Sequence, residues 1–220
     1  MKPLSELIYK ENAWSDIQAW IADSDNKVTI VANERGDGEL ALYRLQISNK
    51  STMGAIALEC GGLLIDRGWL RVLGSGNKEL NNSLISWNEQ STSKIKYPLI
   101  GGLIVAYDVV GGFFAINNGA FDPKSHSVYY LAPDTLEWED TEMTYTDFIN
   151  WSLFGDLNLY YESFRWYGWE QDVEKLSLEE GILIYPYLWS KEGKEVNNAH
   201  KKAVTMKELW EVQNEFMNAL

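Results

Sequence analysis

Few residues in this sequence have the chemistry of a nucleophile, a general base or a metal ligand. There is one cysteine, Cys60, and there are two histidines, His126 and His200. A nucleophile needs a base within hydrogen-bond reach, but His126 lies in an expected turn and His200 in a polar, lysine-containing stretch. Cys60 precedes a Gly-Gly pair, where a small buried thiol packs well. We therefore predict no catalytic Cys–His pair.

Metal and cofactor sites are not indicated either. Zinc sites need clustered Cys and His, and no acidic loop has the alternation around a glycine that calcium loops have. The stretch 73–76 (LGSG) follows an expected strand, as phosphate-binding loops do. However, it lacks the third glycine of the dinucleotide pattern and the Gly-Lys-Ser/Thr of a P-loop, so a tight turn is the better interpretation. We predict no metal and no cofactor.

Carboxylates are the plentiful reactive group, with 32 Asp and Glu in 220 residues. Paired carboxylates can hydrolyse glycosidic bonds, and Asp108, Asp134, Glu137 and Glu139 lie at expected strand ends among aromatic residues. An acidic surface with aromatic residues gives the same pattern without catalysis. We prefer that interpretation and expect a protein that is not an enzyme.

The charge balance restricts the kind of partner. Nineteen Lys and Arg against 32 Asp and Glu give a net charge of -13. Phosphate backbones repel such a chain, so direct nucleic-acid binding is not expected. A basic protein partner would be attracted by long-range steering, although solubility alone explains the charge equally well. The ten Trp and twelve Tyr serve equally as core residues and as interface anchors.

The sequence predicts a cytoplasmic protein. Glu6, Lys10 and Glu11 interrupt the apolar run that a signal peptide would need. No stretch approaches the roughly 20 apolar residues of a membrane helix, so no membrane association is expected. A single cysteine suits a reducing compartment.

Hydrophobic periodicity and turn residues predict the elements. Residues 40–45 fit a strand or a short helix, and 77–96 reads as a surface excursion. The expected helices are one or two within 3–22, and then 53–58, 144–154, 158–166, 169–176 and 205–220. The expected strands are 27–32, 63–66, 69–73, 99–107, 112–116, 127–131, 136–139 and 182–188.

Consecutive strands with short links and no crossover helices imply an antiparallel meander. The expected fold class is α+β, with one domain over residues 1–220 and a mostly antiparallel sheet packed against helices. A meander leaves edge strands, which can pair two copies into a homo-oligomer.

Two stretches carry a resemblance to known families. The segment "IVAYDVVGGFFAINNGAF … SVYYLAPDTLEWEDTEMTYTDFINWSLFGDL" resembles the core of the SUKH (SMI1/KNR4-like) superfamily, here about residues 51–157, with 158–220 as a helical, Trp-rich extension. Over its whole length, through "STMGAIALECGGLLIDRGWLRVLGSG" and "RWYGWEQDV", the chain resembles the bacterial DUF2625 family, which has no assigned function.

The SUKH resemblance implies protein binding, in some relatives as immunity proteins that neutralise nuclease toxins. We therefore predict a non-catalytic binding protein for a basic partner. The residues expected to contact that partner are acidic, with one aromatic anchor: Asp108, Asp134, Glu137, Trp138, Glu139, Asp140 and Glu142. The alternative is a small-molecule or carbohydrate-binding domain, or a weak hydrolase, with a cleft formed by Trp69, Trp87, Trp166 and Trp169.

Overall fold

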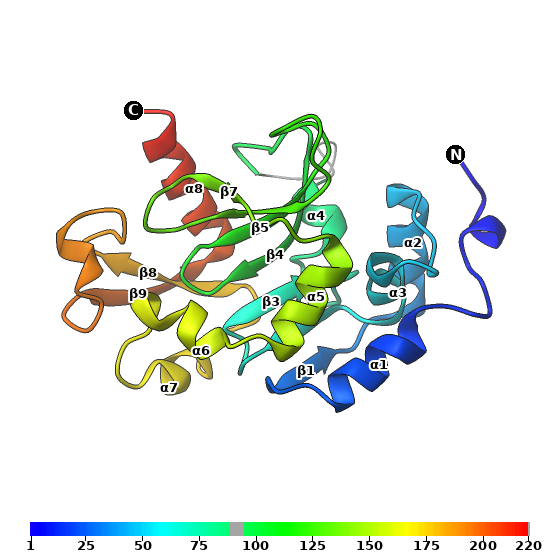
Figure 1. Ribbon diagram of the computed structural model, residues 1–220, viewed down its shortest axis with the longest axis horizontal. Coiled ribbons are helices and arrows are strands. Elements are labelled where there is room, and N and C mark those ends of the chain that lie inside the picture. The colour runs from blue at the N-terminus through cyan, green and yellow to red at the C-terminus, as the bar shows by residue number, and fades with distance from the viewer. Residues whose placement is uncertain (89–94, 220) are drawn as a thin grey trace.

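The computed structural model describes residues 1–88 and 95–219. Its main feature is a seven-stranded antiparallel sheet in which each strand pairs with the next along the chain, from β1 to β7 (Figure 1). The strands are β1 (Val28–Val31), β2 (Gly62–Ile65), β3 (Leu70–Leu73), β4 (Gly102–Asp108), β5 (Phe113–Asn117), β6 (Val128–Leu131) and β7 (Trp138–Asp140). The meander and the single-domain α+β fold predicted from the sequence are confirmed.

Local turn chemistry explains this simple topology. The β2–β3 turn passes through three consecutive residues with positive φ, Asp66, Arg67 and Gly68, a conformation that reverses the chain within a few residues. Between β4 and β5 the register shifts between Ile104 and Ala106, which marks a β-bulge in this hairpin. The sheet therefore forms from neighbouring segments, with β1 and β7 as its edges.

Several of the helices begin at side-chain caps. Thr144 and Thr205 each form a capping box with the acidic residue three positions on, and Ser51 accepts a hydrogen bond from the backbone N–H of Gly54. The α-helices are α1 (Trp14–Ala22), α2 (Arg35–Leu45), α3 (Thr52–Glu59), α4 (Leu84–Asn88), α5 (Tyr145–Phe154), α6 (Leu157–Tyr160), α7 (Trp169–Val173) and α8 (Met206–Met217). Short 3-10 turns occupy Leu4–Glu6, Glu162–Phe164 and Glu192–Lys194.

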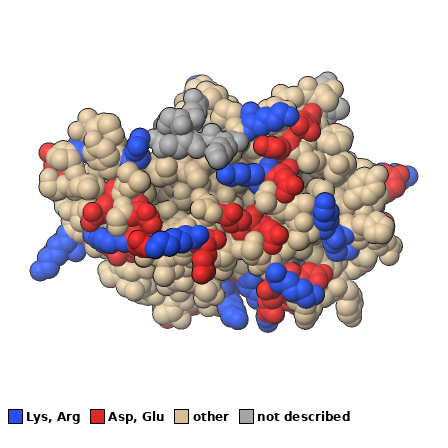
Figure 2. Space-filling view, turned by 180° about the vertical axis from the view of Figure 1, so that it is seen from behind, with Lys and Arg blue, Asp and Glu red and all other residues tan. Residues whose placement is uncertain are grey.

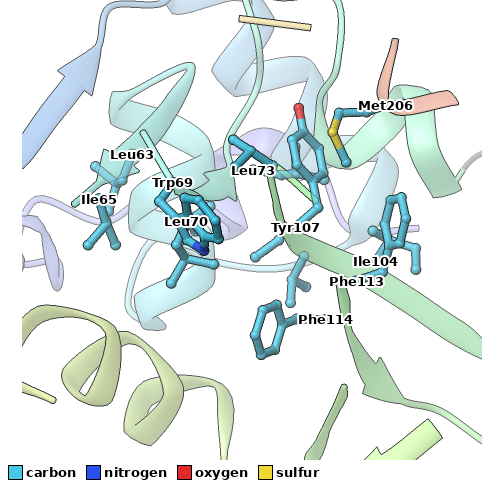
Figure 3. Packing of buried hydrophobic residues seen from close by; sticks show 14 of the residues in the cluster. Leu63, Ile65, Trp69, Leu70, Leu73, Ile104, Tyr107, Phe113, Phe114 and Met206 are labelled. Carbon is cyan, nitrogen blue, oxygen red and sulfur yellow. The ribbon is translucent and has the colours of Figure 1, made fainter. Parts of the chain in front are cut away.

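The sheet is covered on both faces. Phe114 of β5 packs against Phe148 of α5, and α5 crosses in front of the strands in Figure 1. The preceding residue, Phe113, points to the opposite face and packs against Trp87 of α4 and Trp210 of α8. Figure 3 shows the buried side chains of β2 to β5 together with Met206 from the start of α8. The C-terminal helix thus belongs to the same core as the meander.

A two-stranded hairpin of β8 (Glu180–Tyr185) and β9 (His200–Thr205) lies beside the sheet. The backbone N–H of Ile182 donates to the carbonyl of Val109. The buried guanidinium of Arg71 donates to the carbonyls of Ser177, Leu178 and Glu180, and desolvation lowers its pKa. One buried cation therefore holds the hairpin to β3 by charge-assisted hydrogen bonds.

Of the two alternatives for residues 40–45, the structure has the helix, as the end of α2. Two other expectations about the elements need correction. The stretch around His200, expected to be a polar tail, contains strand β9. The prediction that residues 77–96 form a surface excursion is wrong for the first half of that stretch, because Leu80, Leu84 and Trp87 are buried. Residues 89–94 of that stretch lie outside the described residues.

None of the helices in the described part of the chain has the length and apolar character needed to cross a bilayer.

Candidate functional site

Asp108 is an internal residue at the end of β4. Its side chain is 0% exposed. One carboxylate oxygen accepts from the backbone N–H groups of Val110 (3.0 Å) and Gly112 (2.8 Å), and the other accepts from the hydroxyl of Tyr130 at 2.8 Å. Burial raises the pKa of Asp108 to about 6, against the opposing effect of these hydrogen bonds.

The geometry around Asp108 explains the glycine at position 112. A Cβ atom there would lie 2.0 Å from the Asp108 carboxylate and 2.4 Å from the Tyr130 hydroxyl. Asp108 therefore holds the β4–β5 turn and links it to β6. The prediction that Asp108 contacts a partner is wrong, because no surface is left for that contact.

The other predicted residues divide between the two faces of the sheet at edge strand β7. Trp138 and Asp140 pair with Leu131 and Tyr129, whereas Glu139 pairs with Tyr130 on the α5 face. Trp138 packs against Phe121 and Trp210, with ring centroids 4.9 and 6.4 Å apart. The Trp138 side chain is therefore half-buried on the sheet face that α8 covers. Glu139 lies on the opposite face, so β7 does not bring these two side chains together.

The carboxylates near the surface differ in the hydrogen bonds and ion pairs that they form. Asp140 accepts from the hydroxyls of Ser127 and Ser125, and the bond from Ser127 is the main cause that lowers its pKa. Glu137, Glu139 and Glu142 are exposed and Asp134 is half-exposed. Within the described residues, none of these four forms an ion pair.

These residues belong to a longer acidic segment. Residues 125–164 contain no Lys or Arg and eight acidic side chains: Asp134, Glu137, Glu139, Asp140, Glu142, Asp147, Asp156 and Glu162. The face of the molecule in Figure 2 is different, since Lys and Arg lie beside Asp and Glu there. The excess negative charge of the chain is therefore concentrated in the region of β6, β7, α5 and α6.

Two exposed apolar residues on α6 adjoin this charge. Leu159 is 69% exposed and Tyr160 is 40% exposed, and the Asp156 side chain caps the helix that carries them. The Tyr160 ring packs on Tyr130 and Trp151. Burial raises the pKa of Tyr160, and the charges of Asp108, Glu139 and Asp134 raise it further. Glu139 pairs in β7 with Tyr130, whose ring centroid lies 6.0 Å from that of Tyr160.

We call Asp134, Glu139, Leu159 and Tyr160 the acidic contact surface. The sequence reasoning named both carboxylates but missed Leu159 and Tyr160. A short apolar stretch in the sequence does not indicate which of its side chains will be exposed in the fold. The uninterrupted absence of Lys and Arg from 125 to 164 is the signal that could have drawn attention to the region around α6.

The aromatic cleft expected from four tryptophans is not formed. Trp69, Trp166 and Trp169 pack together, and the Arg165 guanidinium lies 4.9 Å from the Trp69 ring and 4.1 Å from the Trp169 ring. Trp87 belongs to a separate cluster on the α8 face. Trp69, Trp87 and Trp166 are buried, so the prediction of a shared aromatic cleft is wrong.

The residues best suited to chemistry are dispersed. Cys60 is buried, and burial raises the pKa of its thiol to about 12, so the thiol is protonated at neutral pH. His126 and His200 are both exposed, in the loop before β6 and in β9. In the described ranges 1–88 and 95–219, no group of three or more His, Cys, Asp or Glu could hold a metal ion.

These features define a single-domain α+β protein with a seven-stranded meander and an acidic contact surface at one edge. The family model described as "Protein of unknown function DUF2625" matches residues 4–209, and the chain belongs to that family. It is 40% identical over 214 residues to "Putative uncharacterized protein YbfG" of Escherichia coli (strain K12), covering 97% of this chain and 96% of that protein.

A second relative is an "Uncharacterized protein" of Haemophilus influenzae (strain ATCC 51907 / DSM 11121 / KW20 / Rd). It is 35% identical over 194 residues, which cover 86% of this chain and 83% of that protein. The DUF2625 resemblance seen in the sequence is thereby confirmed. The SUKH resemblance is not tested by these comparisons and stays a prediction.

Proposed function

We propose that this protein works in the cytoplasm by binding a basic protein through the acidic contact surface. One observation carries the proposal: a segment with eight carboxylates and no Lys or Arg contains two exposed apolar side chains, Leu159 and Tyr160. Protein interfaces commonly combine an apolar or aromatic centre with a charged rim. The acidic contact surface has both parts.

The two parts have different tasks. Leu159 and Tyr160 supply area that loses contact with water on binding, and Tyr160 can also donate its hydroxyl. Asp134 and Glu139 attract a positively charged partner and raise the association rate, an effect that salt screens. Since neither carboxylate has an ion-pair partner among the described residues, binding need not first break one.

In its finer form, the proposal is an immunity-type role in which the partner is a nuclease. A nuclease binds phosphates through Lys and Arg, so its active face is complementary in charge to this surface. Occluding that face would block substrate without any chemistry by this protein. The SUKH resemblance of residues 51–157 supports the same role, and a scaffold function for another basic protein is its alternative.

A paired capture experiment tests the proposal. The baits are the wild-type protein, the double charge reversal Asp134→Lys/Glu139→Lys, and Leu159→Ser. The matched control, Glu6→Lys/Glu11→Lys, makes the same charge change at two exposed residues near the N-terminus, distant in sequence from the acidic contact surface. We expect basic proteins to bind the wild type and the control at low salt, and to be lost from the double reversal.

A purified captured protein then decides the mechanism. Its affinity should fall with salt and fall further with Leu159→Ser, and a nuclease should lose activity when the wild-type protein is added. Equal capture by the double reversal and the wild type would contradict the proposed surface. A partner without nuclease activity would contradict the immunity-type role alone.

A further inference from the structure

The outer strand of the β8–β9 hairpin has an open backbone edge. The backbone N–H of Ile182 in β8 donates to the carbonyl of Val109, on the side away from β9. Opposite residues in an antiparallel pair alternate between hydrogen-bonded and non-bonded pairs. Ala203 pairs with Ile182, so Ala203, and Lys201 two residues before it, turn their N–H and C=O groups away from β8. In the part of the chain that the structure describes, these four backbone groups have no hydrogen-bond partner.

An edge of this kind fits an extended peptide. Unpaired N–H and C=O groups on every second residue match the repeat of a β-strand, which can add to an exposed edge through main-chain hydrogen bonds. Ala203 is exposed, and its methyl group leaves the approach to the edge free of a large side chain. The hairpin has only two strands, and a third strand would complete the hydrogen bonding of β9.

A small pocket lies beside this edge. Its volume is about 230 Å³, and its apolar lining comes from Leu176 after α7 and from Ile182 and Ala203 of the hairpin. Side chains of a strand alternate between its two faces, so the residue of an added strand opposite Ala203 would share the face that lines the pocket. An aliphatic side chain at that position would bury apolar area there.

The charge of β9 favours acidic residues in the added strand. Residues 196–207 contain no Asp or Glu but have three lysines, Lys201, Lys202 and Lys207, in a chain with a net charge of -13. The Lys201 Nζ is engaged, because it donates to the carbonyl of Ala199 at 2.8 Å. Lys202 is exposed and forms no ion pair among the described residues. Its ammonium group is therefore available to a carboxylate of the added strand.

Two carboxylates near these lysines are engaged within the protein. Asp172, which lines the pocket, accepts from the indole N–H of Trp166 at 2.9 Å and from the Nζ of Lys175 at 3.1 Å. Glu208, in the first turn of α8, accepts from the backbone N–H and the hydroxyl of Thr205 at 2.8 and 2.9 Å. Neither carboxylate forms an ion pair with a lysine of β9.

We propose that the open edge of β9 binds an extended acidic segment of a partner protein by strand addition. Acidic residues of that segment lie on the face of Lys202, and the aliphatic residues between them lie on the face of Ala203 and the pocket. Lysines on an edge strand discourage pairing with a like strand, so the partner is not a second copy of β9. The edge shares no residue with the acidic contact surface, and either proposal can fail without the other.

Four probes test the site: the hexapeptide Glu-Val-Glu-Val-Glu-Val with blocked ends, the same peptide with Lys for Glu, the acidic peptide with every backbone nitrogen methylated, and a ten-nucleotide oligothymidylate. Each is titrated into the full-length, isotope-labelled protein, and amide shifts and amide hydrogen exchange are followed by NMR. The acidic peptide should bind about tenfold or more tightly than the other three. Exchange at Lys201 and Ala203 should slow about tenfold when about 90% of the protein is bound, because only the free fraction exchanges.

Several outcomes would overturn the proposal. Unchanged exchange at both amides would mean that no strand is added to β9, and equal binding of the methylated peptide would mean that backbone hydrogen bonds are not used. Tighter binding of the Lys peptide or of the oligothymidylate would assign another class of partner. Protection of the same amides in the free protein that rises with protein concentration would make a second copy the occupant.

Two variants locate the interaction. Ala203→Pro removes one outward N–H and leaves the ladder with β8, and Lys202→Glu reverses the available charge; each should weaken the acidic peptide by about tenfold. Lys202→Glu should also strengthen binding of the Lys peptide. The matched control is Lys10→Glu, the same reversal at an exposed residue of the N-terminal segment, which should leave both affinities unchanged. Wild-type affinity for the acidic peptide in folded Lys202→Glu would contradict the proposed selection by charge.

Discussion

Two carboxylates on the same face of the sheet differ in their surroundings. Asp108 is buried and receives three hydrogen bonds. Glu139 is exposed and has no ion-pair partner among the described residues. Tyr130 lies between them, since its hydroxyl donates to Asp108 and its backbone pairs with Glu139. A buried negative charge here serves the architecture, whereas an exposed one remains available to a partner.

The largest effect that this comparison predicts is on stability. Asp108→Ala should lower the free energy of unfolding by about 3–5 kcal/mol, because it leaves the N–H groups of Val110 and Gly112 and the hydroxyl of Tyr130 buried without an acceptor. Chemical denaturation followed by tryptophan fluorescence measures this. Glu139→Ala is the matched control and should change stability by less than about 0.5 kcal/mol. Similar losses in the two variants would remove the distinction between the two carboxylates.

The pH dependence of stability sharpens the comparison. The pKa of Asp108 is about 6 in the folded protein, against an ordinary value of 3.8. The folded state therefore binds more protons than the unfolded state between these values, and the contribution of Asp108 falls as pH rises from about 4 to 6. The size is up to about 3 kcal/mol, since one pKa unit corresponds to about 1.4 kcal/mol.

Asp108→Asn isolates this contribution. The amide keeps the acceptor for the two N–H groups, and Tyr130 can rotate its hydroxyl to accept from the amide. The difference in unfolding free energy between wild type and Asp108→Asn, measured from pH 4 to 7.5, should change across the window from about 4 to 6 and be flat above it. A flat difference throughout would mean that Asp108 titrates at its ordinary value.

Much of the fold could be predicted from the sequence because its signals are local. Turn residues such as Arg67–Gly68 mark the hairpins, and Thr144 and Thr205 mark helix starts through interactions within three residues. Strand β9 was missed because its burial pattern depends on contact with β8 and α8. A segment of mostly polar residues carries little sign of such long-range pairing.

The candidate site was less predictable for a related reason. Asp108 and Glu139 look alike in the sequence, each beside a β-prone aromatic segment, and only the strand pairing shows that one is covered by Tyr130. Likewise, Trp69 could be placed in a strand, whereas Trp87 was expected in a surface excursion, and the sheet face that each one occupies depends on long-range packing. The number of charged residues could be taken from the sequence, but which of them are buried and which are exposed could not.

A smaller effect is expected at an acidic residue whose charge is used locally. Asp147 of the acidic segment completes the capping box of α5, accepting from the backbone N–H and hydroxyl of Thr144. Thr144→Ala removes half of this box and should lower the free energy of unfolding by about 1 kcal/mol. Denaturation measures it, with the exposed residue Thr29, whose hydroxyl forms no hydrogen bond among the described residues, changed to Ala as the control. Equal losses at both positions would show that the cap contributes nothing specific.

The smallest effect on stability should occur where the proposed effect on binding is large. Leu159 is 69% exposed, so Leu159→Ser removes little buried area and should change the free energy of unfolding by less than about 0.5 kcal/mol. Its neighbour Leu157 is buried in the core, and Leu157→Ser should cost about 2 kcal/mol or more. Denaturation of the two variants compares them directly. A loss at Leu159 as large as that at Leu157 would show that Leu159 supports the fold, and its exposure could then no longer be explained by a partner.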